Sequence, residues 1–195
     1  MHRAFLGLFF ASCKNRIHHI LVNKGRFKSQ ALLNEQALLA CMIYVDLNPI
    51  RADICKTLET SDYTSVKQRI DQIKGSSNDT PFIKLTPFVA GSQTEEGIPF
   101  SLVDYLELTD WTGRDIRKDK RGFINADTPK ILDQLGLDEE SWIETVQSFS
   151  SHFHTFIGAE EQLQSLCQKQ KKKWLCGINL CRKLFKHNNF CPIPI

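Results

Sequence analysis

A tyrosine and an asparagine stand four residues apart in the stretch CMIYVDLNPIRA, which covers residues 41–52. If this stretch is helical, Tyr44 and Asn48 share one face of the helix. A phenol can attack a phosphodiester and form a covalent intermediate, and a carboxamide oxygen can assist a metal-bound phosphate. The same spacing also fits a packed aromatic residue followed by a helix stop before Pro49. The residue types alone leave both interpretations of Tyr44 open.

A second pattern, His152-Phe153-His154, would on a β-strand place two imidazoles on one face, where they could bind Mg²⁺ or Mn²⁺. The residues around it predict a helix instead. In a helix, side chains two positions apart point in different directions and cannot share an ion. We therefore expect no metal site at this pair.

Basic residues gather at both ends of the chain. Residues 1–33 carry six Lys/Arg and residues 162–195 carry seven, and neither segment contains an acidic residue. The run QKQKKKW and the cations after it predict contacts with nucleic-acid phosphates, although a solvated surface would have a similar composition. The candidate DNA-binding residues of this segment are Lys171, Lys172, Lys173, Arg182 and Lys183.

The composition is that of a globular protein, with 42% hydrophobic and 24% charged residues and a net charge of +3. No apolar stretch approaches the roughly 18 residues that a membrane helix needs. The seven cysteines are odd in number and include no C-x-x-C pair, which favours reduced thiols. We expect a cytoplasmic protein with no membrane association.

The hydrophobic periodicity predicts a mainly α-helical chain. Caps and breakers place six helices, over residues 29–48, 61–74, 101–113, 128–136, 138–157 and 159–175. In this prediction Ser29, Ser101 and Thr128 are N-caps, Gly113 and Gly136 end helices, and Pro49 stops the first one. The weak strand candidates are residues 5–10 and 17–22, and residues 76–100 read as an irregular linker.

Two segments together resemble the bacterial HUH single-strand tyrosine transposases, in particular the REP-associated branch. The first is GRFKSQALLNEQALLACMIYVDLNPIRADI with TSDYTSVKQRI, which is similar to the C-terminal part of their catalytic domain. The second is GIPFSLVDYLELTDWTGRDIRKDKRGFI with LGLDEESWIETVQSF, which looks like the accessory region of longer members. The resemblance covers about residues 25–70 and 97–185.

The resemblance assigns roles to three residues. Tyr44 matches the nucleophile that forms a 5′-phosphotyrosine link to single-stranded DNA, and Asn48 matches a position that assists the metal. Arg51 falls at a basic position of the family motif that could contact DNA. The implied cofactor is Mg²⁺ or Mn²⁺, the implied ligand is single-stranded or hairpin DNA, and a homodimer is possible in this family.

The chain departs from the family pattern upstream of Tyr44. Family members carry a His-hydrophobic-His pair on a central strand there, and this chain has no such pair in its first 43 residues. We therefore expect the remnant of an α+β HUH domain, with the tyrosine helix retained and most of the sheet missing. The expected organisation is a non-family segment (1–24), the catalytic remnant (25–75), the linker (76–100) and a helical accessory region (101–190).

The leading functional hypothesis is thus a transposase-family protein for DNA transposition that lacks an intact metal site and is inactive in strand cleavage. The alternative is a non-catalytic helical protein that binds nucleic acid through its basic C-terminal segment. A third possibility is a decayed gene product that folds poorly without its sheet.

Overall fold

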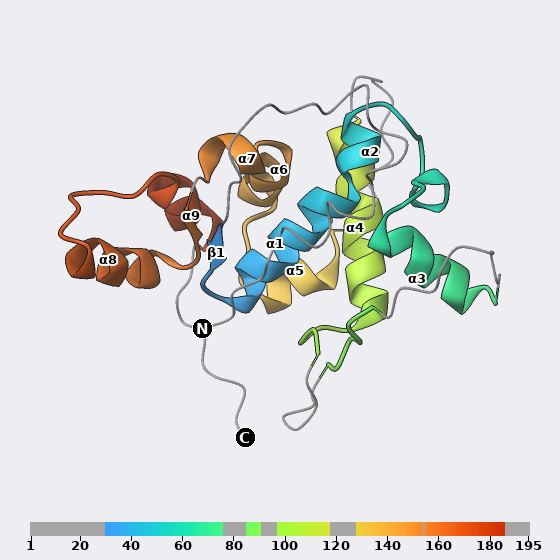
Figure 1. The fold of residues 1–195 in the computed structure, drawn as a ribbon, viewed down its shortest axis with the longest axis horizontal. Helices are drawn as coiled ribbons and strands as arrows, with labels where there is room; N and C mark the ends of the chain where they lie inside the picture. The colour runs from blue at the N-terminus through green and yellow to red at the C-terminus, as the bar shows by residue number, and fades with distance from the viewer. Residues whose placement is uncertain (1–29, 76–84, 91–96, 118–127, 154, 186–195) are drawn as a thin grey trace.

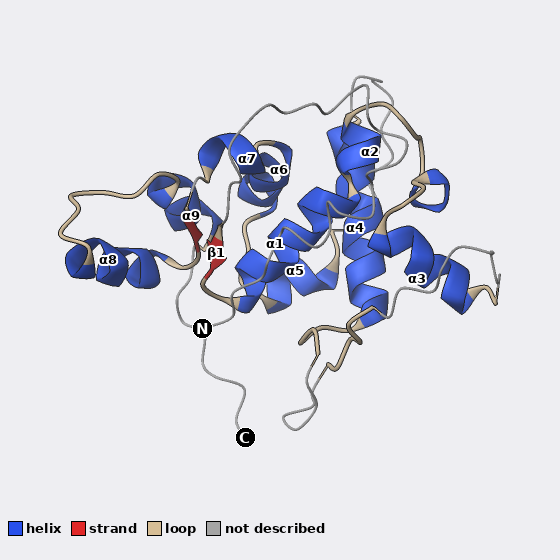
Figure 2. Ribbon diagram, viewed as in Figure 1, coloured by secondary structure: helices blue, strands red, loops and turns tan. Residues whose placement is uncertain are grey.

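The structure, a computed structural model, describes residues 30–75, 85–90, 97–117, 128–153 and 155–185. It is mainly helical, as the periodicity predicts (Figure 2). The helices are α1 (Glu35–Asp46), α2 (Asn48–Arg51), the 3₁₀ turn η2 (Leu58–Thr60), α3 (Ser65–Ile73), α4 (Leu102–Ile116), α5 (Lys130–Gln134), α6 (Glu139–Gln147), α7 (Phe149–His152), α8 (Glu160–Lys169) and α9 (Ile178–Leu184). The strand candidates at 5–10 and 17–22 lie outside the described residues.

The first helix begins later than the prediction from Ser29. Ala31–Leu32 form a short strand, β1, which pairs in parallel with β2 (Phe156–Ile157). Asn34 then caps α1, because its side-chain oxygen accepts a 2.8 Å hydrogen bond from the Ala37 backbone N–H. The predicted start was wrong because the backbone of residues 31–32 pairs with β2, a segment far away in the sequence. No local pattern reveals this pairing.

Pro49 ends α1 as expected. The helix stops at Asp46, Leu47 caps it, and α2 starts at once with Pro49 in its first turn, where a missing N–H costs nothing. The sequence therefore produces two short helices in series, and Tyr44 lies on the first while Asn48 and Arg51 lie on the second.

Gly113 does not end a helix. Ser101 caps α4 as predicted, but α4 continues through Gly113 to Ile116. A Cβ atom at position 113 would come within 3.0 Å of the Leu47 side chain at the end of α1. The absence of a side chain at Gly113 thus allows α4 to lie close to the end of α1. The prediction that this glycine ends the helix was wrong.

The predicted helix over residues 138–157 is divided into α6, α7 and β2. Asp138 caps α6 because its side chain accepts a hydrogen bond from the Ser141 backbone N–H, and Ser148 is the C-cap of this helix. Phe153 has an extended backbone and leads toward β2, which pairs with β1. The apolar stripe is nevertheless largely buried, with Trp142, Val146, Phe149 and Phe153 at 0–1% exposure.

The helices predicted over residues 128–136 and 61–74 are closer to the structure. α5 begins after Pro129 instead of at a Thr128 cap, and the Thr128 hydroxyl donates to Glu139. Gly136, with a positive φ of 62°, closes this turn as predicted. α3 starts at Ser65, a few residues inside its predicted range, with Thr64 as its cap.

The core joins the two regions that the sequence divides at the linker. α1 and α4 both pack on α6, and one cluster of buried side chains runs from Leu32 to Leu184. The linker contributes too: Phe88 and Ile98 form a β-bridge, and Phe100 is buried. In Figure 1, α8 lies at one end of the molecule and α3 at the other, with α1, α4 and α6 between them. Within the described residues, no helix has the length and apolar character to cross a membrane.

A buried carboxylate ties three of these helices together. Asp46, at the end of α1, is 2% exposed. It accepts hydrogen bonds from the Ser65 backbone N–H (3.1 Å) and hydroxyl (2.8 Å) at the start of α3, and from the Tyr105 hydroxyl (2.5 Å) in α4. Arg69 of α3 adds a positive charge nearby. Since a buried carboxylate without partners is very unfavourable, these donors fix how α3 and α4 sit on α1.

Removing one donor should measurably loosen the core. We expect Tyr105→Phe to lower the free energy of unfolding by about 1–3 kcal/mol, the usual cost of leaving a buried polar group without its hydrogen-bond partner. Urea denaturation followed by circular dichroism measures this change. Tyr63→Phe is the matched control, because Tyr63 is 57% exposed and should change stability little. Equal stability of the two variants would contradict the role given to Tyr105.

The same network predicts a pH dependence. Burial raises the pKa of Asp46 above its ordinary 3.8, although its hydrogen bonds act in the opposite direction. The fold therefore favours the protonated acid, and the stability from Asp46 is complete below pH 3.8 and is lost as the pH rises through the raised value. We expect the advantage of the wild type over Asp46→Asn to shrink between acid and neutral pH in denaturation series. An advantage that grew over this range would contradict the prediction.

Candidate nucleic-acid interface

The ring of Tyr44 is packed between its neighbours. It stacks on Phe149 of α7, with ring centroids 4.9 Å apart and planes 26° apart. The guanidinium carbon of Arg51 lies over the ring, 3.9 Å from its centroid. Tyr44 is half-buried and belongs to the side chains that surround the core. This is the environment of a structural aromatic residue in a cation–π contact.

The structure brings together the three residues that the transposase resemblance singles out. Arg51 donates from Nη2 to the Asn48 side-chain oxygen (3.0 Å) and from Nη1 to the backbone oxygen of Gln147 (3.3 Å), at the C-terminal end of α6. The C-terminal end of a helix attracts a positive charge, so the contact of Arg51 with Gln147 holds α2 against α6. Its third nitrogen, Nε, is buried without a hydrogen-bond partner among the described residues.

These contacts do not fit a divalent-metal site. The Asn48 oxygen, which would be the ligand, accepts from Arg51, and the guanidinium charge beside it would repel a second cation. No group of three or more His, Cys, Asp or Glu side chains in the described part of the chain could hold an ion. His152 ends α7 with its Nε2 3.9 Å from Glu144, while His154 lies outside the described residues.

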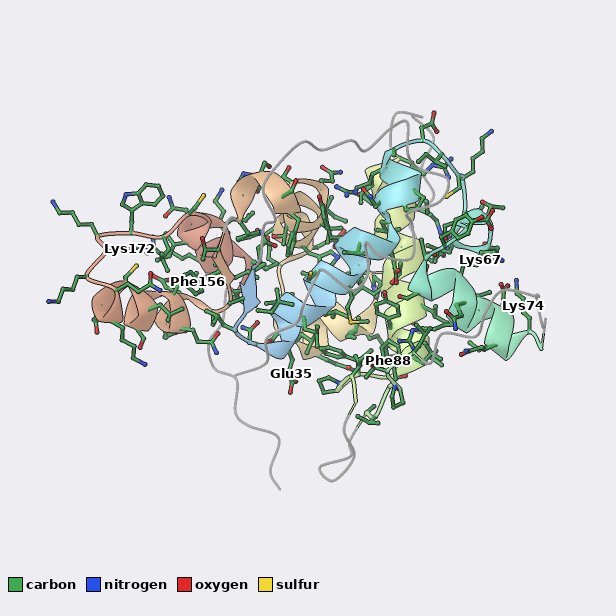
Figure 3. The ribbon with its side chains drawn as sticks, viewed as in Figure 1. Glu35, Lys67, Lys74, Phe88, Phe156 and Lys172 are labelled. Atoms are coloured by element: carbon green, nitrogen blue, oxygen red, sulfur yellow. The ribbon has the colours of Figure 1, made fainter. Side chains whose placement is uncertain are left out.

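The predicted basic segment forms the turn between α8 and α9, at the outer end of the molecule. Residues 171–174, which we call the basic loop, are Lys171, Lys172, Lys173 and Trp174, and all four are exposed. Figure 3 shows Lys172 at the opposite end of the molecule from Lys67 and Lys74. The basic loop is therefore separate from α3, and its charges face solvent.

The basic loop begins with a strained backbone. Lys171 follows the C-cap of α8 with φ of 52°, and Lys172 N–H donates to the Cys167 carbonyl (2.9 Å), which closes the helix in the manner of a Schellman motif. Glycine is usual at this position, because a side chain in the left-handed region costs about 1 kcal/mol. A lysine here adds a charge at a position where stability favours glycine.

Trp174 is the largest side chain in the basic loop and is 69% exposed. It borders an open hollow of about 500 Å³ between α8 and α9, which we call the α8–α9 hollow. The lining residues are Gln164, Cys167, Gln168, Lys171, Lys172, Lys173, Trp174, Ile178 and Arg182. An exposed indole that lines the same hollow as three lysines can stack on a nucleobase while the cations contact phosphates.

The other predicted cations of this region differ in their surroundings. Lys183, on α9, is exposed. Arg182 lines the hollow but is paired with Glu160, at 2.6 Å. Sequence reasoning named the basic run but assigned no role to Trp174, Asp46 or Glu160. The exposed tryptophan could have been noticed from its place next to three lysines, whereas the other two depend on contacts between distant segments.

Cysteine chemistry does not add to the site. The described cysteines are free thiols, namely Cys41, Cys55, Cys167, Cys176 and Cys181. Burial raises the pKa of the Cys41 thiol to about 12, so this thiol is protonated at neutral pH.

Comparison of the chain with protein-family profiles, with curated proteins and with solved structures finds no significant match.

Proposed function

We propose that this protein binds single-stranded nucleic acid through the basic loop without cleaving it. The observation that carries the proposal is the exposed Trp174 beside Lys171, Lys172 and Lys173 at the edge of the α8–α9 hollow. Base stacking on an aromatic side chain combined with phosphate contacts is how many proteins hold unpaired strands. The resemblance of residues 25–70 to the catalytic domain of the HUH transposases, which act on single-stranded DNA, supports DNA as the ligand.

Two further features support binding at this loop. Lys171 occupies a backbone position suited to glycine, so its charge is present at the expense of some stability. The three lysines and Trp174 are all exposed, so a strand could approach without rearrangement of the core.

Salt titration tests this proposal. With an oligothymidylate probe and fluorescence anisotropy, we expect the affinity to fall steeply as salt rises. Replacing Lys171, Lys172 and Lys173 with alanine should flatten the slope of log K against log salt by about 2, since each phosphate contact contributes about 0.7. Trp174→Ala should instead weaken binding by about 1–3 kcal/mol with little change in the slope, because stacking releases no counterions.

Lys74→Ala is the matched control for the lysine variants, because Lys74 is an exposed lysine at the other end of the molecule (Figure 3). An equal loss of affinity in Lys74→Ala and Lys172→Ala would indicate a general charge effect and would refute the assignment to the basic loop. Binding to anionic lipid vesicles with no binding to the oligonucleotide would contradict the proposal altogether.

Strand cleavage by Tyr44 is a second candidate function. The observation in its favour is that Tyr44, Asn48 and Arg51 converge at the junction of α1 and α2. Against it, the Tyr44 ring is engaged by Phe149 and Arg51. The described residues around it also do not fit a divalent-metal site, so Mg²⁺ or Mn²⁺ would need ligands from elsewhere.

The two functions are separated by a covalent-adduct assay. We expect no adduct when the protein is incubated with hairpin-bearing single-stranded DNA and Mn²⁺ and analysed by denaturing electrophoresis, because the ring of Tyr44 is packed. An adduct that forms in the wild type and disappears in Tyr44→Phe would establish cleavage and refute the non-catalytic proposal. Tyr63→Phe serves as the control, since Tyr63 is exposed and lies outside this cluster.

A further inference from the structure

Arg182 lies on the rim of the α8–α9 hollow, but its charge is already engaged. Its Nε is 3.0 Å from Glu160 Oε1 and 2.9 Å from Oε2, and its Nη2 is 2.6 Å from Oε1. This is a bidentate ion pair between the first turn of α8 and the last turn of α9. A carboxylate held in this way uses the same fork of guanidinium donors that would bind a phosphate.

Glu160 is well suited to remain ionised in this position. The hydrogen bond from Arg182 lowers the pKa of Glu160, and the Gln164 side chain donates to the same carboxylate at 2.7 Å. The N-terminal end of α8 also favours a negative charge in its first turn. The pair is therefore present throughout the neutral pH range.

The neighbouring cations differ from Arg182. No ion pair joins Lys171, Lys172 or Lys173 to an acidic residue of the described part of the chain. A phosphate that approaches the hollow therefore meets three available ammonium groups and one guanidinium with a competing carboxylate.

We propose that Glu160 limits the affinity of the α8–α9 hollow for nucleic acid by holding Arg182 away from the phosphates, and that release of Arg182 adds one phosphate contact. This inference rests on the proposed function of the basic loop. In this proposal, Arg182 contributes to phosphate binding only when its ion pair with Glu160 is broken. The side chain of Arg182 is 57% exposed, so the pair is open to competition by a phosphate.

The test compares Glu160→Gln with Glu161→Gln in the oligothymidylate titration. The two variants lose the same charge from the same turn of α8, but the second leaves the pair with Arg182 intact. We expect Glu160→Gln to bind about threefold more tightly at low salt and to steepen the slope of log K against log salt by about 0.7, as one added phosphate contact requires. Glu161→Gln should show a smaller gain and no change in the slope.

A double variant shows whether the gain depends on Arg182. Glu160→Gln combined with Arg182→Gln should lose both the added affinity and the added slope. Circular dichroism melts confirm that each variant is folded, and Glu160→Ala, which breaks the pair in a different way, should change the affinity in the same direction as Glu160→Gln.

Four outcomes would overturn the inference. An equal gain in Glu161→Gln would show that only the local field has changed, and a gain that survives in the double variant would remove Arg182 from the explanation. If the wild type binds and Glu160→Gln binds no more tightly, the inference alone is wrong. If the wild type does not bind oligothymidylate at any salt concentration, the proposed function is wrong and the inference falls with it.

Discussion

The burial of one carboxylate constrains most of this structure. Asp46 can lie in the core only because α3 and α4 bring donors to it, from Ser65 and Tyr105. Removing one of these donors would leave part of a buried carboxylate unpaired, which costs more than the hydrogen bond contributes when it is made. The arrangement of the three helices is therefore fixed by chemistry as well as by apolar packing.

This constraint has a consequence for the tyrosine two residues earlier on α1. With the end of α1 held at Asp46 and the chain turned at Pro49, Tyr44 and Arg51 meet the side chain of Phe149 and the C-terminus of α6. The three residues singled out by family resemblance are thus adjacent, and Arg51 contacts the other two: it donates to the Asn48 side chain and lies over the Tyr44 ring. Their contacts within the protein favour stability of the junction over chemistry on a bound strand.

The basic loop has the opposite character. Its side chains are exposed, its first residue has a backbone conformation that disfavours lysine, and its tryptophan lies outside the core. Leu175 is buried directly after Trp174, so the loop is anchored to the body of the protein while its charged part faces solvent. Groups that add little to folding but share one open surface are the best candidates for contact with a ligand.

By itself, the sequence determined the helical character, the break at Pro49, the cap at Ser101, the buried aromatic stripe and the basic run, because each depends on residues close together in the chain. Only the tertiary structure decided that residues 31–32 form a strand, that the segment around Phe153 leaves the helix, and that Gly113 is a packing residue, since each of these needs a partner far away in sequence. The same holds for the candidate sites. Spacing placed Tyr44 and Asn48 together, but the stacking of Tyr44 on Phe149 and the pairing of Arg182 with Glu160 come from contacts between distant segments of the chain.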